Sequence, residues 1–269
     1  MKEYTYKSAL KEIGVSYIGN TRHSAKMQHS YNSGTETYCV YLAPADLSGR
    51  NVCPNSEHCK EFCLNGSGHN KLDILTHGVH DSIINKARIK KTQAFYKNRS
   101  LFIRTIIHEI KTAKKRASAH GREFSVRLNG TSDLSPVTFR YDGKNLLELF
   151  PDVQFYDYTK VPSRQNLLAK YPNYDITLSF DGYNWDACEA FLKRGGKVAV
   201  IFHGKTLPAT YKGYKVVDAN GYDMRYLDPK GCIMGLSYHP VANDYKSGKY
   251  IAPISPAIIS ENSEYSLYN

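Results

Sequence analysis

The sequence predicts one α/β domain of barrel type, in which parallel strands are covered by helices. Three observations support this prediction: strand-like and helix-like segments alternate, their connections are short, and polar residues gather where the strands end. Roughly seven strands of this kind favour a TIM-like βα barrel, complete or partial, over an open sheet. No Gly-rich dinucleotide fingerprint follows the first strand, which makes a Rossmann fold the weaker alternative.

The predicted elements begin with a core strand over residues 37–43, where β-forming and bulky residues are continuous. A turn-rich cysteine loop follows at 44–70, and a long helical segment at 72–118 carries one apolar stripe. The strands expected after it are 123–128, 153–158, 175–180, 197–202, 214–217 and 232–236. The helices expected between them are 144–150, 163–170 and 185–194.

The number of domains and the cellular location are predicted from features that the sequence does not contain. No internal repeat or low-complexity linker divides the chain, so residues 1–269 are expected to form a single domain with an irregular tail from about residue 246. No apolar run reaches the roughly 20 residues of a membrane-spanning helix, and the polar N-terminus carries no apolar signal region. We therefore expect a cytoplasmic protein whose six cysteines are thiols or metal ligands rather than disulfides.

The charge of the chain is strongly positive and unevenly spread. The net charge is +11, and residues 86–122 contain twelve Lys or Arg against one acid, Glu109. Such a basic helical surface attracts phosphate backbones, which predicts nucleic acid or a nucleotide as partner. A solvated helix face is the alternative. The residues predicted to bind nucleic acid are Lys90, Lys91, Lys114 and Lys115.

The cysteine loop carries the strongest chemical signal. Cys53, Cys59 and Cys63 are spaced C-x5-C-x3-C, and such short loops close on one centre at little cost in entropy. Thiolates suit zinc or an iron–sulfur cluster, and three of them leave one iron of a four-iron (4Fe-4S) cluster open. Zinc could instead take His58 or His69 as its fourth ligand. The remaining cysteines stand alone in strand or helix patterns and are expected to behave as small apolar residues: Cys39, Cys188 and Cys232.

Polar residues follow the predicted strands one after another. Functional groups of βα barrels sit where strands end, so these residues are expected to form a polar mouth beside the cysteines. Each alone could be an ordinary turn or cap residue. The residues predicted to bind a cofactor are Asn129, Gly130, Thr131 and Ser132. The residues predicted to be catalytic are Asp133, Asp157, Lys160 and Asp181.

Four segments resemble the gene-product-88 family of bacteriophage proteins. They are Cys53-Pro54…Cys59…Cys63-Leu64-Asn65, Arg127 to Asp133, Tyr156 to Lys160, and Asp223-Met224-Arg225…Asp228-Pro229. The resemblance covers roughly residues 39–236 and implies a phage protein in the cytoplasm of a bacterial host cell. It implies no particular activity.

The sequence is more distantly similar to the radical S-adenosylmethionine barrels. In those enzymes a three-cysteine loop after the first strand holds a four-iron cluster, and a polar motif after the second strand contacts the amino group of the cofactor. Residues 129–133 stand where that motif would stand, so the likeness implies S-adenosylmethionine as cofactor and Asp133 as its anchor. The spacing departs from that family, which usually has C-x3-C-x2-C.

Three functions follow from these features. The first is an enzyme with an iron–sulfur cluster that acts on nucleic acid or nucleotides. The second is a zinc-containing enzyme that exchanges or modifies a base, with Asp133 or Asp181 as nucleophile or base. The third is a non-catalytic nucleic-acid-binding protein in which the metal is structural.

Overall fold

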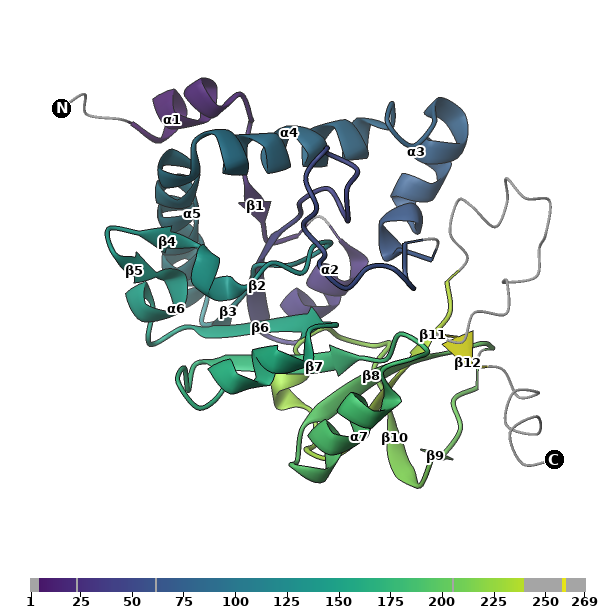
Figure 1. The fold of residues 1–269 in the computed structure, drawn as a ribbon. Coiled ribbons are helices and arrows are strands. Elements are labelled where there is room, and N and C mark those ends of the chain that lie inside the picture. Colours follow the sequence, from purple (N-terminus) through teal and green to yellow (C-terminus); the bar gives the residue numbers. More distant parts are fainter. Residues whose placement is uncertain (1–4, 23, 61, 205, 240–257, 260–269) are drawn as a thin grey trace.

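The computed structural model describes residues 5–22, 24–60, 62–204, 206–239 and 258–259, and its centre is one large sheet (Figure 1). Five strands lie side by side, parallel, in the order of the chain. They are β2 (Thr35–Val40), β3 (Glu123–Arg127), β6 (Gln154–Thr159), β7 (Tyr174–Ser179) and β8 (Lys197–Phe202). This arrangement confirms the α/β class and the mostly parallel sheet.

Five further strands extend the sheet. They are β1 (Gly19–Asn20), β11 (Ile233–Ser237), β10 (Tyr214–Asp218), β9 (Thr210–Tyr211) and β12 (Ile258–Ile259). β11 and β10 continue it in parallel beyond β8, while β1 and β9 are antiparallel strands at its two edges. Within the described residues β1 and β9 do not pair with each other, so no closed barrel is found. A small hairpin, β4 (Arg140–Tyr141) and β5 (Lys144–Asn145), stands apart.

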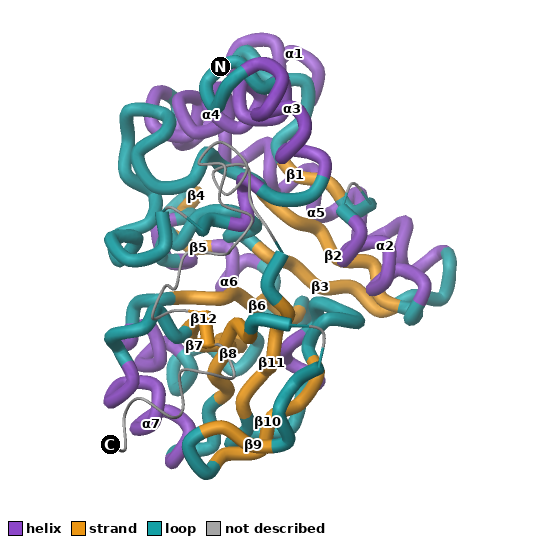
Figure 2. The backbone as a smooth tube through the Cα atoms, turned by 90° about the vertical axis from the view of Figure 1, so that its right-hand side faces the viewer, coloured by secondary structure: helices purple, strands orange, loops and turns teal. Residues whose placement is uncertain are grey.

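The helices divide between the two ends of the sheet (Figure 2). Toward the β1 end of the sheet lie α1 (Tyr6–Ile13), α2 (Ala25–Asn32), α3 (His69–His77), α4 (Ile83–Lys97) and α5 (Arg99–Ala119). Beside β8 lies α7 (Trp185–Lys193), and the short α6 (Leu146–Leu149) follows β5. Short 3-10 helices fill the connections: η1 (Leu64–Gly66), η2 (Pro136–Thr138), η3 (Pro162–Leu167) and η4 (Arg225–Leu227). No described helix is long and apolar enough to cross a membrane.

The two faces of the sheet differ in chemistry, because successive side chains of a strand point to opposite faces. On β2, Tyr38 and Val40 join the main apolar core with side chains of α4 and α5. The alternate residue Thr37 turns to the other face, where its hydroxyl is hydrogen-bonded to that of Ser125 at 2.9 Å. The main apolar core therefore lies on the helix-covered face, and the opposite face carries polar groups at β2 and β3 and a small apolar cluster of Ala199, Ala219 and Met234.

The predicted helical segment 72–118 is three helices rather than one. Gly78 ends α3 with a positive φ of 89°, a conformation that favours glycine. The Ser82 hydroxyl accepts the Asn85 N–H at 3.1 Å and so begins α4. Asn98 ends α4 and also caps α5, its side chain accepting the Leu101 N–H at 3.3 Å. These caps interrupt a run of residues whose apolar periodicity is continuous.

Other boundaries also differ from the prediction. The first predicted strand is observed as β2, and α1, β1 and α2 precede it without having been predicted. The predicted helix 163–170 is the 3-10 helix η3. The cysteine loop is irregular apart from η1, as expected, and ends as α3 begins. The predicted irregular tail lies outside the described residues except for Ile258–Ile259, which form β12 beside β8.

Candidate functional site

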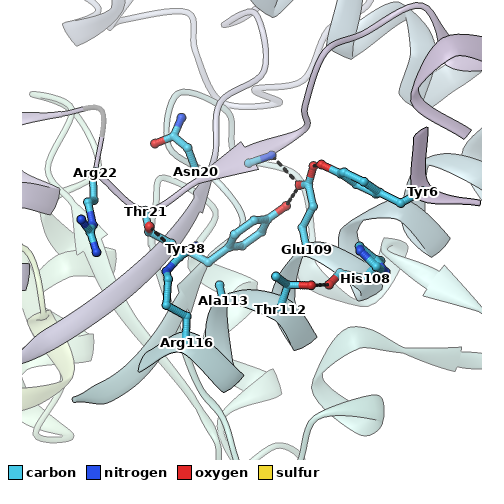
Figure 3. A pocket seen from close by; sticks show the side chains of 11 residues that line it. Tyr6, Asn20, Thr21, Arg22, Tyr38, His108, Glu109, Thr112, Ala113 and Arg116 are labelled. Atoms are coloured by element: carbon cyan, nitrogen blue, oxygen red, sulfur yellow. Dashed lines mark hydrogen bonds between the residues drawn. The ribbon is translucent and has the colours of Figure 1, made fainter. Parts of the chain in front are cut away.

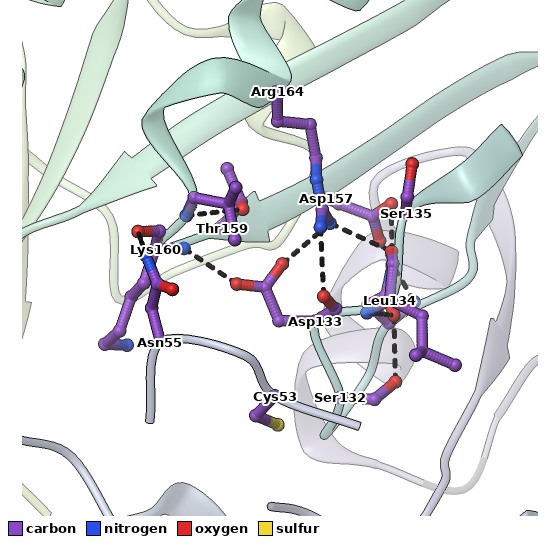
Figure 4. Close-up of polar contacts among 12 residues, drawn as sticks. Cys53, Asn55, Ser132, Asp133, Leu134, Ser135, Asp157, Thr159, Lys160 and Arg164 are labelled. Atoms are coloured by element: carbon purple, nitrogen blue, oxygen red, sulfur yellow. Dashed lines mark hydrogen bonds and ion pairs between the residues drawn. The ribbon is translucent and has the colours of Figure 1, made fainter. Parts of the chain in front are cut away.

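The cysteine loop and the polar turn after β3 meet at the edge of the sheet where the parallel strands end (Figure 4). The backbone N–H of Asp133 donates to the Val52 carbonyl at 2.8 Å, next to Cys53. The Asn55 amide donates to the Lys160 carbonyl at 2.9 Å. These bonds tie the loop after β2 to the ends of β3 and β6, so the polar strand ends lie beside the cysteines.

Cys53, Cys59 and Cys63 line one cavity of about 180 Å³. All three are half-buried free thiols. The sulfur of Cys53 accepts the Ala45 N–H at 3.3 Å and approaches the Thr131 carbonyl oxygen at 3.9 Å. In the described part of the chain, no three Cys, His, Asp or Glu side chains stand in coordinating positions for a metal ion.

The cavity disfavours negatively charged thiolates in the absence of a cation. Burial raises the pKa of Cys53 to about 12, and the neighbouring sulfurs of Cys63 and Cys59 add to this effect. Burial also raises the pKa of Cys63, against the backbone N–H of Asn65 and the positive charges of Lys160 and Arg88. A metal that binds thiolates must therefore displace protons from these groups.

The other cysteines and the nearby histidines lie elsewhere. Cys39 and Cys188 are fully buried, and Cys188 belongs to the apolar core, as expected for cysteines that act as small apolar residues. Cys232 is half-buried ahead of β11. The ring of His58 packs on Tyr183 at a centroid distance of 4.1 Å, and His69 begins α3. The described residues that line the cysteine cavity include neither histidine.

Asn129 and Asp157 bind each other across the ends of β3 and β6. The Asp157 carboxylate accepts the Asn129 N–H at 3.0 Å and the Asn129 side-chain amide at 3.1 Å. The Asn129 side-chain oxygen in turn accepts the Ser132 hydroxyl and the Leu134 N–H, both at 2.9 Å. Three of the predicted site residues thus hold the turn 129–134 in shape.

Gly130 and Thr131 close the packing between β3 and β2. The Gly130 N–H donates to the Val40 carbonyl at 2.8 Å. The Thr131 hydroxyl donates to the Leu42 carbonyl at 2.5 Å. A Cβ at position 130 would lie 2.6 Å from a ring carbon of Tyr41, so only glycine fits without movement.

Asp133 forms a buried ion pair with Arg164 (Figure 4). Its carboxylate binds the Arg164 guanidinium at 2.7 Å and accepts the Lys160 N–H at 2.9 Å. Arg164 also donates to the backbone oxygens of Asp133 at 3.0 Å and Leu134 at 2.9 Å. The side chains are only 4% and 12% exposed for Arg164 and Asp133 respectively. This geometry favours a structural role over both a nucleophile and a helix cap.

Asp181 and Lys160, the other two residues predicted to be catalytic, have different surroundings. The Asp181 carboxylate accepts the N–H groups of Tyr183 and Asn184, both at 3.0 Å, which forms the turn before α7. Lys160 is half-buried, and its positive charge offsets a small part of the rise that burial gives the pKa of Cys63. The charges of two predicted catalytic residues thus reach the cysteines, that of Lys160 at Cys63 and that of Asp133 at Cys53.

The four predicted nucleic-acid-binding lysines do not share one exposed surface. Lys91 is buried, with its ammonium 3.9 Å from the centroid of the Tyr17 ring, and burial lowers its pKa to about 8. Lys114 is paired with Asp152. Lys90 on α4 and Lys115 on α5 are exposed. The sequence showed the charge of this segment but not which side of each helix meets the core.

A second polar cluster lies on the face of the sheet opposite the core, and the sequence predicted its residues only as part of the polar mouth. Arg127 on β3 binds Asp223 at 2.7 Å, and the Tyr156 hydroxyl donates to the same carboxylate at 3.2 Å. Arg225 and Asp228 form a second ion pair, with both side chains 1% exposed. The motif Asp223-Met224-Arg225…Asp228 marked these residues, but only the fold brings Asp223 to β3 and β6.

The Asp133–Arg164 pair gives a stability prediction. In Asp133→Asn the Arg164 charge stays buried without its partner, so the free energy of unfolding should fall by about 3–5 kcal/mol. The exposed Asp142→Asn, with the same chemical change, should unfold as the parent does. Chemical denaturation of both variants checks this. A stable but inactive Asp133→Asn would instead favour a direct role in catalysis.

The titration of Asp157 gives a pH prediction. Burial raises the pKa of Asp157 to about 6, and the charges of Arg164 and Arg127 offset only part of that effect. The folded state thus prefers the protonated form, so this group's contribution to stability is complete below pH 4 and falls by about 3 kcal/mol as pH rises through 6. The Asp157 carboxyl carbon should titrate by NMR near pH 6. A midpoint at or below 4 would contradict the account.

Comparisons with known proteins place the chain in a family. A search of the curated proteins and a search of the solved structures each return no match. None of the comparisons supports the likeness to radical S-adenosylmethionine enzymes. A family model described as gene product 88 matches residues 9–250, most of the chain and more than the motifs alone covered. The chain therefore belongs to the gene-product-88 family of phage proteins.

Proposed function

We propose that Cys53, Cys59 and Cys63 bind one metal centre at the rim of the sheet, with a four-iron cluster as the first candidate. The observation that carries the proposal is that all three cysteines line the same cavity. Thiol side chains are the ligands that such clusters and zinc prefer. The positive charges of Lys160 and Arg88 near Cys63 would offset part of the negative charge of a thiolate-bound centre.

The size of the cavity favours a group of several atoms over a single ion. Its volume of about 180 Å³ is many times the roughly 10–15 Å³ that one water requires. A zinc ion held at about 2.3 Å from its sulfurs would fill little of that space. Neither His58 nor His69 is among the described lining residues, so no histidine is at hand as a fourth ligand. Zinc remains the second candidate.

A cluster bound by three thiolates would supply electron transfer and one iron open to a ligand. The chain's own residues would orient that ligand. Lys160 offers a cationic group beside Cys63, and the turn 129–134 holds the rim in shape. We place the reaction at the mouth of a partial βα barrel, a proposal supported by the parallel strands that follow one another in chain order. S-adenosylmethionine is a candidate for the open iron position.

Metal analysis tests the proposal directly. Protein isolated without oxygen should carry about four irons and four sulfides per chain, with broad absorbance near 400 nm. Serine at position 53, 59 or 63 should remove most of this content, because each position supplies a ligand. Cys232→Ser, at a half-buried thiol outside the cavity, should keep it. One zinc per chain in place of iron would favour the structural alternative. Equal metal content in all variants would refute both.

We propose nucleic acid or a nucleotide as the substrate or partner. The net charge of +11 and the membership of a phage family support this, together with the exposed lysines of α4 and α5. A base-exchanging enzyme and a purely binding protein would share this partner. A variant that loses nucleic-acid binding but keeps its metal would show that the partner and the metal bind independently.

The salt dependence of binding checks the partner. Affinity for single-stranded DNA should fall steeply with salt, because each phosphate contact releases counterions. The double variant Lys90→Glu/Lys115→Glu should bind more weakly and show a smaller salt slope. Lys215→Glu/Lys230→Glu makes the same charge change at two exposed lysines near β10. If both double variants lose the same affinity, binding depends on the overall charge of the protein and not on the exposed lysines of α4 and α5.

A further inference from the structure

A second cavity, of about 460 Å³, lies between α1, β1 and α5 (Figure 3). Its volume falls within the range of roughly 300–1,000 Å³ that small-ligand sites occupy. It shares no lining residue with the cysteine cavity. A ligand bound here would therefore contact groups other than those around the proposed metal centre.

The floor of this cavity is a carboxylate whose acceptor sites are already used. Glu109 accepts the hydroxyls of Tyr6 at 2.7 Å and Tyr38 at 2.5 Å. It also accepts the backbone N–H groups of Ile18 at 3.0 Å and Gly19 at 2.9 Å. These four bonds join α1, β1, β2 and α5 at one point. The cavity thus has a preformed floor, and its single acidic lining residue has little capacity left for a ligand.

The two ends of the cavity differ in character (Figure 3). At one end the rings of Tyr6 and His108 stack, with centroids 4.6 Å apart and planes at 20°. At the other end lie Arg22, Thr21 and Arg116. Arg22 is exposed, and the Arg116 side chain is 41% exposed although it also binds Glu36 and Thr21. Arg22 also donates to the Tyr31 hydroxyl at 3.1 Å, with its guanidinium 4.2 Å from that ring's centroid. One cavity is thus lined by aromatic rings at one end and by two arginines at the other.

The basic character continues along α5 outside the cavity. Lys111 and Lys115 are exposed and lie three and seven residues after His108, which places them on the same face of the helix. A row of positive charge beside aromatic rings is the combination that single-stranded nucleic acids require, with bases on the rings and phosphates on the cations.

We propose that this cavity is a nucleotide-binding site, in which a base stacks at the Tyr6–His108 end and a phosphate binds Arg22 and Arg116. The proposal rests on nucleic acid or a nucleotide being the partner of this protein, and it gives that partner a position. The ligand is a free nucleotide or one unit of a single strand, since both present the same base and phosphate. The site binds and orients this ligand, apart from the rim of the sheet.

Fluorescence anisotropy with a short labelled single-stranded oligonucleotide tests the site. Arg22→Ala and His108→Ala should each raise the Kd at least about fivefold, the effect of losing a phosphate or stacking contact. Each variant has a matched control. Arg140→Ala removes an exposed arginine from β4, and His77→Ala an exposed histidine from α3. Thermal unfolding of all four variants verifies that they fold.

Competition experiments identify the source of the ligand. Displacement of the probe by a nucleoside monophosphate indicates a free nucleotide, and displacement by unlabelled oligonucleotide alone indicates a strand. Either result supports the site if the two cavity variants are weakened. Inorganic phosphate that competes as well as the nucleotide would overturn the role of the aromatic end. Cavity variants that bind like the parent would overturn the site while leaving the partner in place. A parent protein that binds no probe would overturn both.

Discussion

The buried ion pair between Asp133 and Arg164 holds together the rim on which the candidate site is built. The Asp133 carboxylate joins the turn after β3 to the start of η3 through Arg164 and the Lys160 N–H. The Asp133 backbone N–H binds Val52, one residue before Cys53. One residue thus connects the segments that follow β2, β3 and β6, and the first of these contains Cys53. Because both charges lie away from water, neither is tolerated without the other.

Because these polar residues bind one another, the sequence revealed where they gather at the strand ends but not the role of each one. The alternation of strands and helices predicted the α/β class and the parallel sheet. The cysteine spacing predicted a shared centre, and the three cysteines do line one cavity. Sequence patterns do not show which carboxylate accepts which donor. Asn129, Asp157 and Asp181 therefore read as active-site groups, although their observed bonds shape turns. Lys91 was misjudged for a related reason, because periodicity did not reveal that it packs against Tyr17.

The parts of the fold that the sequence left unpredicted depend on long-range contacts. The N-terminal elements α1 and β1 are short, and Glu109, some ninety residues away, joins them to α5. No local pattern shows such a bond. The two edges of the sheet could not be predicted either, because β1 and β9 are two-residue strands with little periodicity. The cavity beside Glu109 exists only where these distant segments meet.

The described residues form two separate cavities, one lined by thiols at the rim and one with cationic and aromatic side chains beside α1, β1 and α5. The central claim is that the rim cavity is a metal centre. X-ray absorption at the metal edge of protein isolated without oxygen tests it most directly. The account predicts a first shell of sulfur at about 2.3 Å, with an iron–iron shell beyond it if a cluster is present. A shell of only nitrogen and oxygen, or the absence of any bound metal, would contradict it.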